Sequence, residues 1–175
     1  PLPAPSFLAM HPTLAVLYAV TETETSELVA FDVSDDVPSE IGRIGSGGSF
    51  ACHVAIAADG TQAYVAHYGT GEVSSIGLDG DGAPASLLSA HVDAESALGP
   101  RADRQDGPHA HFTAIDPVTG VLLACDLGTD TVRRYLPGPD GLEFDGIAVT
   151  LPAGSGPRHL VCAGDLIYVA CELSN

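Results

Sequence analysis

The sequence predicts an all-β protein, because short apolar runs rich in β-branched residues alternate with Gly, Asp and Pro along the whole chain. Runs of about four to six residues between turn signals are typical of strands, and the 3.6-residue periodicity of long helices is hard to find. The expected strands, in order, lie in segments 7–10, 16–20, 28–33, 54–58, 63–66, 112–115, 121–125, 147–151 and 166–171.

A repeated phrase is the second observation. An apolar strand, a turn containing Gly, a second apolar strand and a Gly-Thr turn recur along the chain, with a degenerate copy near its start. The phrase aligns Phe7 with His53, His111 and His159, which lie about 50 residues apart. Repeats of this size with several strands each are typical of the four-stranded blades of a β-propeller, whereas a β-sandwich shows no such phrase.

The chain length indicates a partial propeller. At about 50 residues a blade, 175 residues make about three and a half four-stranded blades, whereas closed propellers typically have 4 to 8 blades. We expect one partial β-propeller over 1–175, with approximate units 1–46, 47–106, 107–153 and 154–175. An insertion is expected as a loop at 83–107. An open arc exposes a strand edge and an apolar face, so we expect self-association or the rest of a propeller to close it.

The charge balance excludes several partners. The chain has 23 acidic residues against 6 basic ones, all arginine, and a formal net charge of −17. Such a field repels nucleic acid and anionic lipid, so neither a nucleic-acid nor a membrane partner is expected. No apolar run approaches the ~20 residues of a membrane-spanning helix.

The four cysteines, Cys52, Cys125, Cys162 and Cys171, form no CxxC pair. We expect free thiols, since a chain of this size does not need disulfides to fold. No metal and no cofactor is predicted.

Two histidines are candidate catalytic residues. His109 and His111 are separated by one residue, so on an extended strand both side chains point to the same side. Such a pair can bind a metal, or one ring can act as a general acid or base near neutral pH. A purely structural role for the pair is the alternative interpretation.

Arginine and glutamate side chains complete the candidate site. Arg158 follows a Gly-Pro loop, and its planar fork suits a carboxylate or phosphate; the alternative is an ion pair between blades. Glu172 follows an apolar strand and aligns with His67 and Asp126 at the ends of sister strands, which predicts a shared mouth position; the alternative is a solvated turn. Arg104 is expected at the rim of the same pocket.

Several phrases together resemble one known family. They are Pro5-Ser6-Phe7-Leu8-Ala9, Cys52-His53-Val54 leading into Tyr68-Gly69-Thr70-Gly71, Arg104-Gln105-Asp106-Gly107-Pro108-His109-Ala110-His111, Asp126-Leu127-Gly128-Thr129-Asp130, Gly156-Pro157-Arg158-His159-Leu160 and Glu172-Leu173-Ser174-Asn175. The chain resembles the seven-bladed propeller lactonase family, which includes bacterial propeller-type 6-phosphogluconolactonases and fungal carboxy-muconate lactonizing enzymes. The resemblance covers nearly the whole chain.

The resemblance implies a His, Arg and Glu site on one mouth of the propeller. The matching positions are His109 or His111 and Glu172 as catalytic residues and Arg158 as a substrate-binding residue. Independently of the resemblance, we expect Arg104 at the rim to help Arg158 bind the substrate. It also implies the middle blades of a seven-bladed ring, a further site arginine beyond the chain, and a cytoplasmic enzyme. Where the family usually has Asn before the glutamate, this chain has Cys171.

The expected substrate is a small lactone that carries a phosphate or carboxylate. Hydrolysis of 6-phosphogluconolactone is the leading hypothesis, and cycloisomerisation of carboxy-cis,cis-muconate is the alternative. A non-catalytic propeller used as a binding platform is a second class of function, since propellers host many functions. Metal-dependent lactonase chemistry at the two neighbouring histidines is a third, but no third ligand is evident in the sequence.

Overall fold

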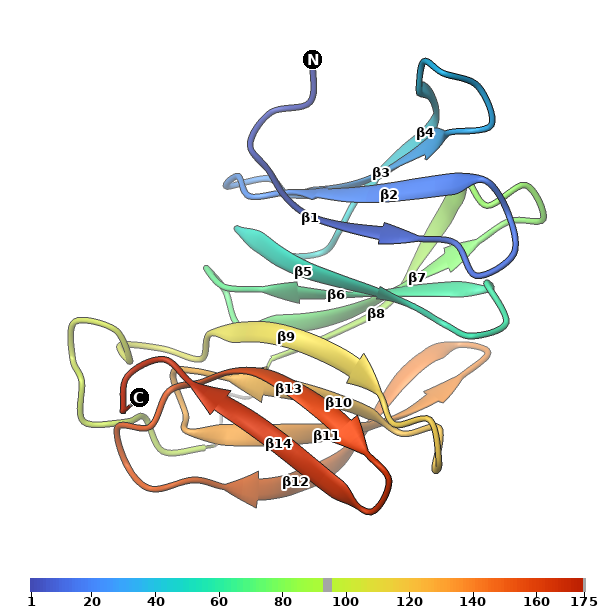
Figure 1. Ribbon diagram of the computed structural model, residues 1–175. Helices are drawn as coiled ribbons and strands as arrows, with labels where there is room; N and C mark the ends of the chain where they lie inside the picture. Colours follow the sequence, from blue (N-terminus) through green and yellow to red (C-terminus); the bar gives the residue numbers. More distant parts are fainter. Residues whose placement is uncertain (93–95, 175) are drawn as a thin grey trace.

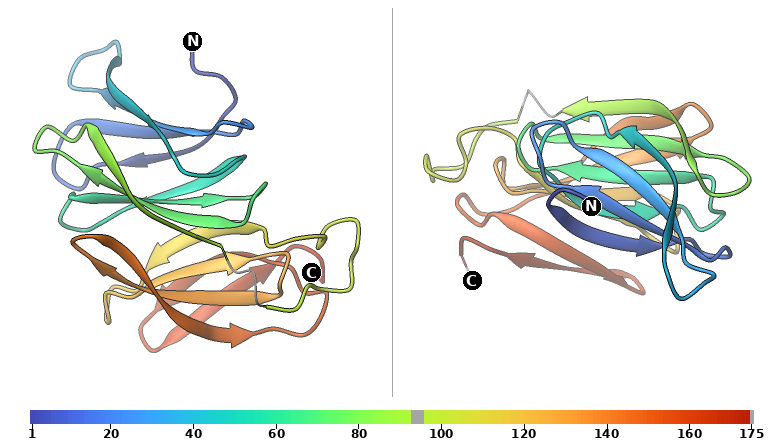
Figure 2. Two further views of the ribbon diagram at one scale, coloured as in Figure 1. Left: turned by 180° about the vertical axis from the view of Figure 1, so that it is seen from behind. Right: turned by 90° about the horizontal axis from the view of Figure 1, so that it is seen from above.

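The computed structural model describes residues 1–92 and 96–174. In these residues, fourteen strands form three four-stranded antiparallel sheets and one two-stranded sheet, and the strands within each sheet follow chain order. Figures 1 and 2 show the sheets stacked side by side, with the first sheet at one end of the arc and the two-stranded sheet at the other. The predicted fold class, an all-β protein built from propeller blades, is confirmed.

The sheets have the strand order of propeller blades. The first comprises β1 (Pro5–Met10), β2 (Val16–Thr21), β3 (Glu27–Asp32) and β4 (Ser39–Gly45). The second comprises β5 (Ala51–Ile56), β6 (Gln62–His67), β7 (Glu72–Leu78) and β8 (Pro84–Val92). The third comprises β9 (Ala110–Ile115), β10 (Leu122–Asp126), β11 (Thr131–Gly138) and β12 (Gly141–Thr150). The last sheet pairs β13 (Pro157–Ala163) with β14 (Leu166–Cys171).

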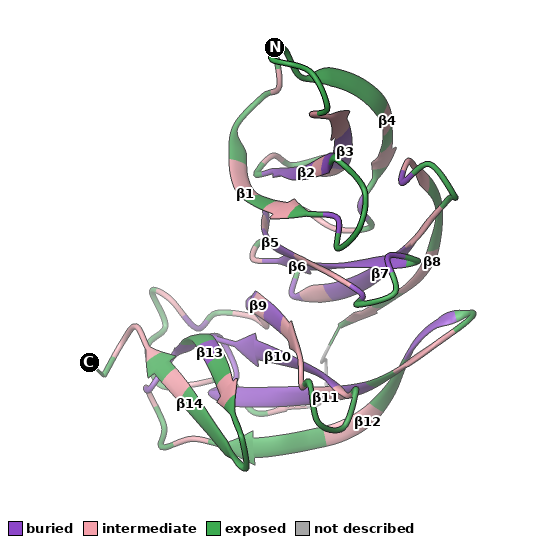
Figure 3. Cartoon of the chain, turned by 45° about the vertical axis from the view of Figure 1, so that its right-hand side comes forward, coloured by how far each residue is buried: buried purple, intermediate pink, exposed green. Residues whose placement is uncertain are grey.

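The core lies between neighbouring blades. Side chains alternate across a strand, so one strand serves two interfaces: Val65 of β6 packs toward the first blade, whereas Tyr64 and Ala66 pack toward the third. A third apolar cluster, which includes Leu123 and Leu160, joins the third blade to β13. The middle strands are therefore buried on both faces, while β4, β8 and the end of β12 are largely exposed (Figure 3).

Aromatic rings join the innermost strands of successive blades. Phe7 contacts His53, His53 contacts Phe112, and Phe112 contacts His159, with ring centroids 4.1, 4.0 and 4.8 Å apart. The strand register explains this series, because these four residues pair with the equivalent position of the second strand in each blade. The expected alignment of His111 with His53 and His159 is wrong by one residue: Phe112 holds that position, and His111 lies in a β-bulge beside it.

Part of the expected insertion is regular structure. Residues 84–92 form β8, which pairs with β7, so the loop predicted over 83–107 is wrong for that stretch. Residues 93–95 of the predicted loop lie outside the described residues. The four cysteines are free thiols. Among the described residues, no helix is long and apolar enough to cross a membrane.

Candidate functional site

A bulge near the start of each innermost strand shapes one end of the arc. The bulged residues are Ser6, Cys52, His111 and Arg158, one for each blade. Ser6 and Cys52 bond to backbone carbonyls of the next blade, including that of Ala51 for Ser6 and that of His111 for Cys52. Bulges commonly redirect side chains beside active sites, and here two of them carry His111 and Arg158 in neighbouring blades.

A second repeated position lies just after the second strand of each blade. The backbone amides of Glu22, Tyr68, Leu127 and Glu172 donate to the carbonyls of Ala4, Phe50, His109 and Gly156, respectively. Glu172 is therefore equivalent to Tyr68 and Leu127. The expected alignment of Glu172 with His67 and Asp126 is wrong by one residue, because Cys171 pairs with Pro157 as His67 pairs with Ala51.

Glu172 joins the two arginines predicted to bind substrate. Its Oε1 accepts a hydrogen bond from Nη2 of Arg104 at 2.5 Å, and its Oε2 accepts one from Nη1 of Arg158. Burial opposes ionisation of Glu172, but the hydrogen bonds from the two guanidiniums outweigh it, so its pKa is lowered. The structure thus brings together Arg104, Arg158 and Glu172 from three separate segments.

Tyr68 connects this cluster to the histidine motif. Nε and Nη2 of Arg104 both donate to the Tyr68 hydroxyl at 3.3 Å, and the Tyr68 ring stacks on His109 with centroids 4.5 Å apart. The hydrogen bonds with Tyr68 and with Glu172 raise the pKa of Arg104. Sequence reasoning placed Tyr68 only in the core or at the rim. Its equivalence to Glu172 would have marked it as a site residue, but the one-residue misalignment of Glu172 concealed that equivalence.

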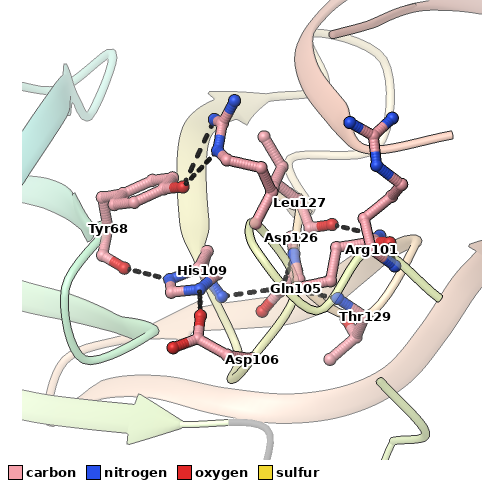
Figure 4. Close-up of polar contacts among 10 residues, drawn as sticks. Tyr68, Arg101, Gln105, Asp106, His109, Asp126, Leu127 and Thr129 are labelled. Carbon is pink, nitrogen blue, oxygen red and sulfur yellow. Dashed lines mark hydrogen bonds and ion pairs between the residues drawn. The ribbon is translucent and has the colours of Figure 1, made fainter. Parts of the chain in front are cut away.

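His109 uses both ring nitrogens to hold the loop that enters β9. Nδ1 donates to the carbonyl oxygen of Tyr68 at 2.6 Å, and Nε2 lies 3.0 Å from the carboxylate of Asp106 (Figure 4). The hydrogen bond with His109 lowers the pKa of Asp106. With both nitrogens engaged, His109 positions its neighbours and has no free ring nitrogen to offer a substrate.

His111 is the histidine that faces the arginine cluster. Burial and the nearby charge of Arg158 lower its pKa to about 4, so the ring is neutral at pH 7. Its Nδ1 is buried without a hydrogen-bond partner in the described part of the chain. The ring contacts Tyr68 and His159 edge-on, with centroids 5.7 Å away in each case. Of the two candidate histidines, His111 is the one with a ring nitrogen that has no hydrogen-bond partner among the described residues, and that nitrogen is buried.

Asp130 ties the loop of Arg104 to the loop of Arg158. Its Oδ1 accepts from Nε2 of Gln105 at 2.9 Å and from the amide of Gly156 at 2.7 Å. Its Oδ2 accepts from the amide of Gly154 at 2.7 Å. Because Gln105 follows Arg104 and Gly156 lies two residues before Arg158, one buried carboxylate sets the spacing of both guanidiniums.

Asp126 holds the turn beneath the histidine motif. Its fully buried carboxylate accepts hydrogen bonds from the amides of His109, Gly128 and Thr129 at 2.9 to 3.1 Å. Arg133, also fully buried, forms an ion pair with it at 3.0 Å. A buried carboxylate of this kind is stable only when it is paired and hydrogen-bonded, which makes Asp126 a structural group.

The arrangement suits an anion, because two guanidiniums converge at one place. No group of three or more His, Cys, Asp or Glu side chains within residues 1–92 and 96–174 is placed to hold a metal ion. At the opposite end of the first two blades, a cavity of about 530 Å³ is lined by Leu14, Val16, Asp32, Asp79 and Asp81, among others. That cavity has three carboxylates and no basic residue in its lining, so it disfavours anions.

The fold and the site define a β-propeller protein with arginine, glutamate and histidine side chains gathered at one mouth. The chain belongs to the lactonase family of seven-bladed β-propellers, since the family described as "Lactonase, 7-bladed beta-propeller" matches residues 2–175. This confirms the family expected from the sequence.

Named relatives and solved structures cover the same region. The chain is similar to the 6-phosphogluconolactonase of Bacillus subtilis, at 27% identity over 98% of this chain and 49% of that protein. It is 32% identical to an uncharacterized protein of Staphylococcus saprophyticus, over 91% of this chain and 47% of the relative. The structure of a periplasmic gluconolactonase of Pseudomonas aeruginosa is 26% identical, with a TM-score of 0.85 over 97% of this chain and 51% of that one. The chain thus spans about half the length of the curated relatives it matches.

Proposed function

We propose that the protein hydrolyses a small anionic lactone, with 6-phosphogluconolactone as the preferred substrate. The observation that carries the proposal is the convergence of Arg104 and Arg158 on one carboxylate at the mouth of a chain with net charge −17. Two guanidiniums make a site for a phosphate or carboxylate, because their planar forks match its oxygens. The names of the relatives in Bacillus subtilis and Pseudomonas aeruginosa support a lactone substrate.

In this proposal His111 is the base. A neutral imidazole takes a proton from water, and the water oxygen adds to the lactone carbonyl carbon. The ring C–O bond then breaks, and the ring oxygen takes the proton from the imidazolium, which restores the neutral base. The charge of Arg158 helps to lower the pKa of His111, so a substrate anion that neutralises Arg158 raises that pKa. Substrate binding therefore makes His111 a stronger base, and Glu172 beside it favours the protonated ring.

Cycloisomerisation differs in that an intramolecular carboxylate, and not water, attacks. None of the three relatives reported above is named as a cycloisomerase, so hydrolysis is the function we propose. The cytoplasmic location, and the closing of the arc by the rest of a seven-bladed ring, stay predictions.

Arg158→Ala in the full-length protein tests this function, with Arg43→Ala as the matched control. Both changes remove one positive charge, but Arg43 lies on the outermost strand of the first blade, where it pairs with Glu40 and Glu27. We expect Arg158→Ala to raise KM for 6-phosphogluconolactone at least tenfold and to lower kcat, while Arg43→Ala matches the unchanged protein. Equal kinetics for the two variants would remove Arg158 from the site, and a full-length protein that hydrolyses no lactone would refute the function.

A further inference from the structure

One carboxylate fills the space between the two arginines. Glu172 gives one oxygen to Arg104 and the other to Arg158, which is how a bound phosphate or carboxylate would engage the same pair. Its side chain is only 22% exposed, whereas those of Arg104 and Arg158 are 35% and 46% exposed. Within the described residues, the Glu172 carboxylate is thus the most buried of the three groups, and both arginines are more exposed than it is.

The Glu172 carboxylate and an incoming substrate anion compete for the same two arginines. The two arginines and ionised Glu172 together carry a net charge of +1, and a substrate phosphate that meets both guanidiniums also meets the Glu172 carboxylate. Two anionic groups a few ångströms apart repel each other strongly, so both cannot hold the same guanidinium edges. One of them has to leave.

We propose that Glu172 is a resident anion that occupies the seat of the substrate's phosphate or carboxylate in the free protein and is displaced when the substrate binds. This inference rests on the proposed function, because it concerns the same site. Displacement removes the guanidinium hydrogen bonds that keep Glu172 ionised, so the released carboxylate becomes more basic. Binding of the substrate anion thereby frees a second proton acceptor beside His111.

A purely structural role for Glu172 predicts the opposite sign. If the carboxylate only held the two arginines in place, its removal would let the like-charged guanidiniums separate and would weaken anion binding. If it is the resident anion, its removal leaves the seat vacant and strengthens anion binding. The direction of the change therefore separates the two roles.

Inorganic sulfate is the probe, titrated by calorimetry into the full-length protein and into two variants, Glu172→Gln and Glu40→Gln. Both substitutions keep the side-chain shape, remove one negative charge and loosen an arginine pair, but Glu40 pairs with Arg43 on the surface. We expect Glu172→Gln to bind sulfate about tenfold more tightly than the unchanged protein, as the removal of one charge near a dianion predicts. Glu40→Gln should stay within about twofold.

Affinity in Glu172→Gln equal to that in Glu40→Gln, weaker than in the unchanged protein, or undetectable would overturn the inference. The lactonase assay is read separately. Tighter sulfate binding in Glu172→Gln with no lactone hydrolysis by the full-length protein would refute the proposed function and leave the resident anion standing. Tighter binding together with a lower kcat would support both.

Discussion

Replacing Asp130 with asparagine should loosen both arginines of the mouth at once. Asp130 is 4% exposed, and its carboxylate accepts three hydrogen bonds, from Gln105, Gly154 and Gly156. The asparagine amide has one acceptor oxygen, so at least one donor loses its partner in a buried place. A hydrogen bond to a charged group contributes about 1.5–3 kcal/mol, so we expect the free energy of unfolding to fall by about 2–4 kcal/mol.

The assay pairs urea unfolding with KM for 6-phosphogluconolactone in the full-length protein. Asp116→Asn is the matched control, because Asp116 also accepts hydrogen bonds from Val118 and Thr119, but in an exposed turn at the far end of the sheet. We expect KM to rise about tenfold in Asp130→Asn and to stay unchanged in Asp116→Asn. Lost stability with an unchanged KM would refute the claim that Asp130 sets the spacing of the arginines, and no change in either quantity would refute the hydrogen-bond reasoning itself.

Three further predictions concern stability, the rim and the turn of the motif. Burial, with a smaller contribution from the charges of His159 and His111, lowers the pKa of His53 to about 3, so the unfolded state binds the proton more readily and stability is lost as pH falls below about 6.5. Between pH 6 and pH 5, the free energy of unfolding measured with urea should fall by about 1.4 kcal/mol more in the unchanged protein than in His53→Phe. An equal fall in the two proteins would contradict this. Tyr68→Phe keeps the stack on His109 but removes the acceptor for Arg104, so KM should rise about fivefold. A KM equal to that of the unchanged protein would count against the rim contact. Gly128→Ala would place a Cβ far inside van der Waals contact with the Gly107 carbonyl oxygen, so it should lower the free energy of unfolding by more than about 2 kcal/mol. Gly80→Ala meets open space and should lower it by less than about 1 kcal/mol; similar losses in the two variants would argue against this close approach.

The repeat made the fold predictable, but not every strand of it. Strands buried between two blades read as continuous apolar runs, which is why β2 and β10 were expected at nearly their observed positions. The outer strands β4 and β8 carry few apolar residues in a row because they are largely exposed. Such strands give no run to detect, and β8 was therefore expected as part of a loop.

The site was predictable only in part. Composition made the arginines conspicuous, and the structure brings Arg104 and Arg158 together through Glu172. The repeat misplaced His111 and Glu172 by one residue, because the phrases were aligned on matching histidine and charged residues, whereas the strand register places Phe112 and Cys171 at those positions. Which histidine keeps a free ring nitrogen depends on contacts between distant segments, and no local pattern encodes those.

The most direct test of the account is a crystal structure of the full-length protein with 6-phosphogluconate, the hydrolysis product. The account predicts that the phosphate lies within about 3 Å of the guanidinium nitrogens of both Arg104 and Arg158, with His111 beside the newly formed carboxylate. A phosphate bound at the opposite end of the blades, or anywhere that leaves both arginines without a contact to it, would contradict the account.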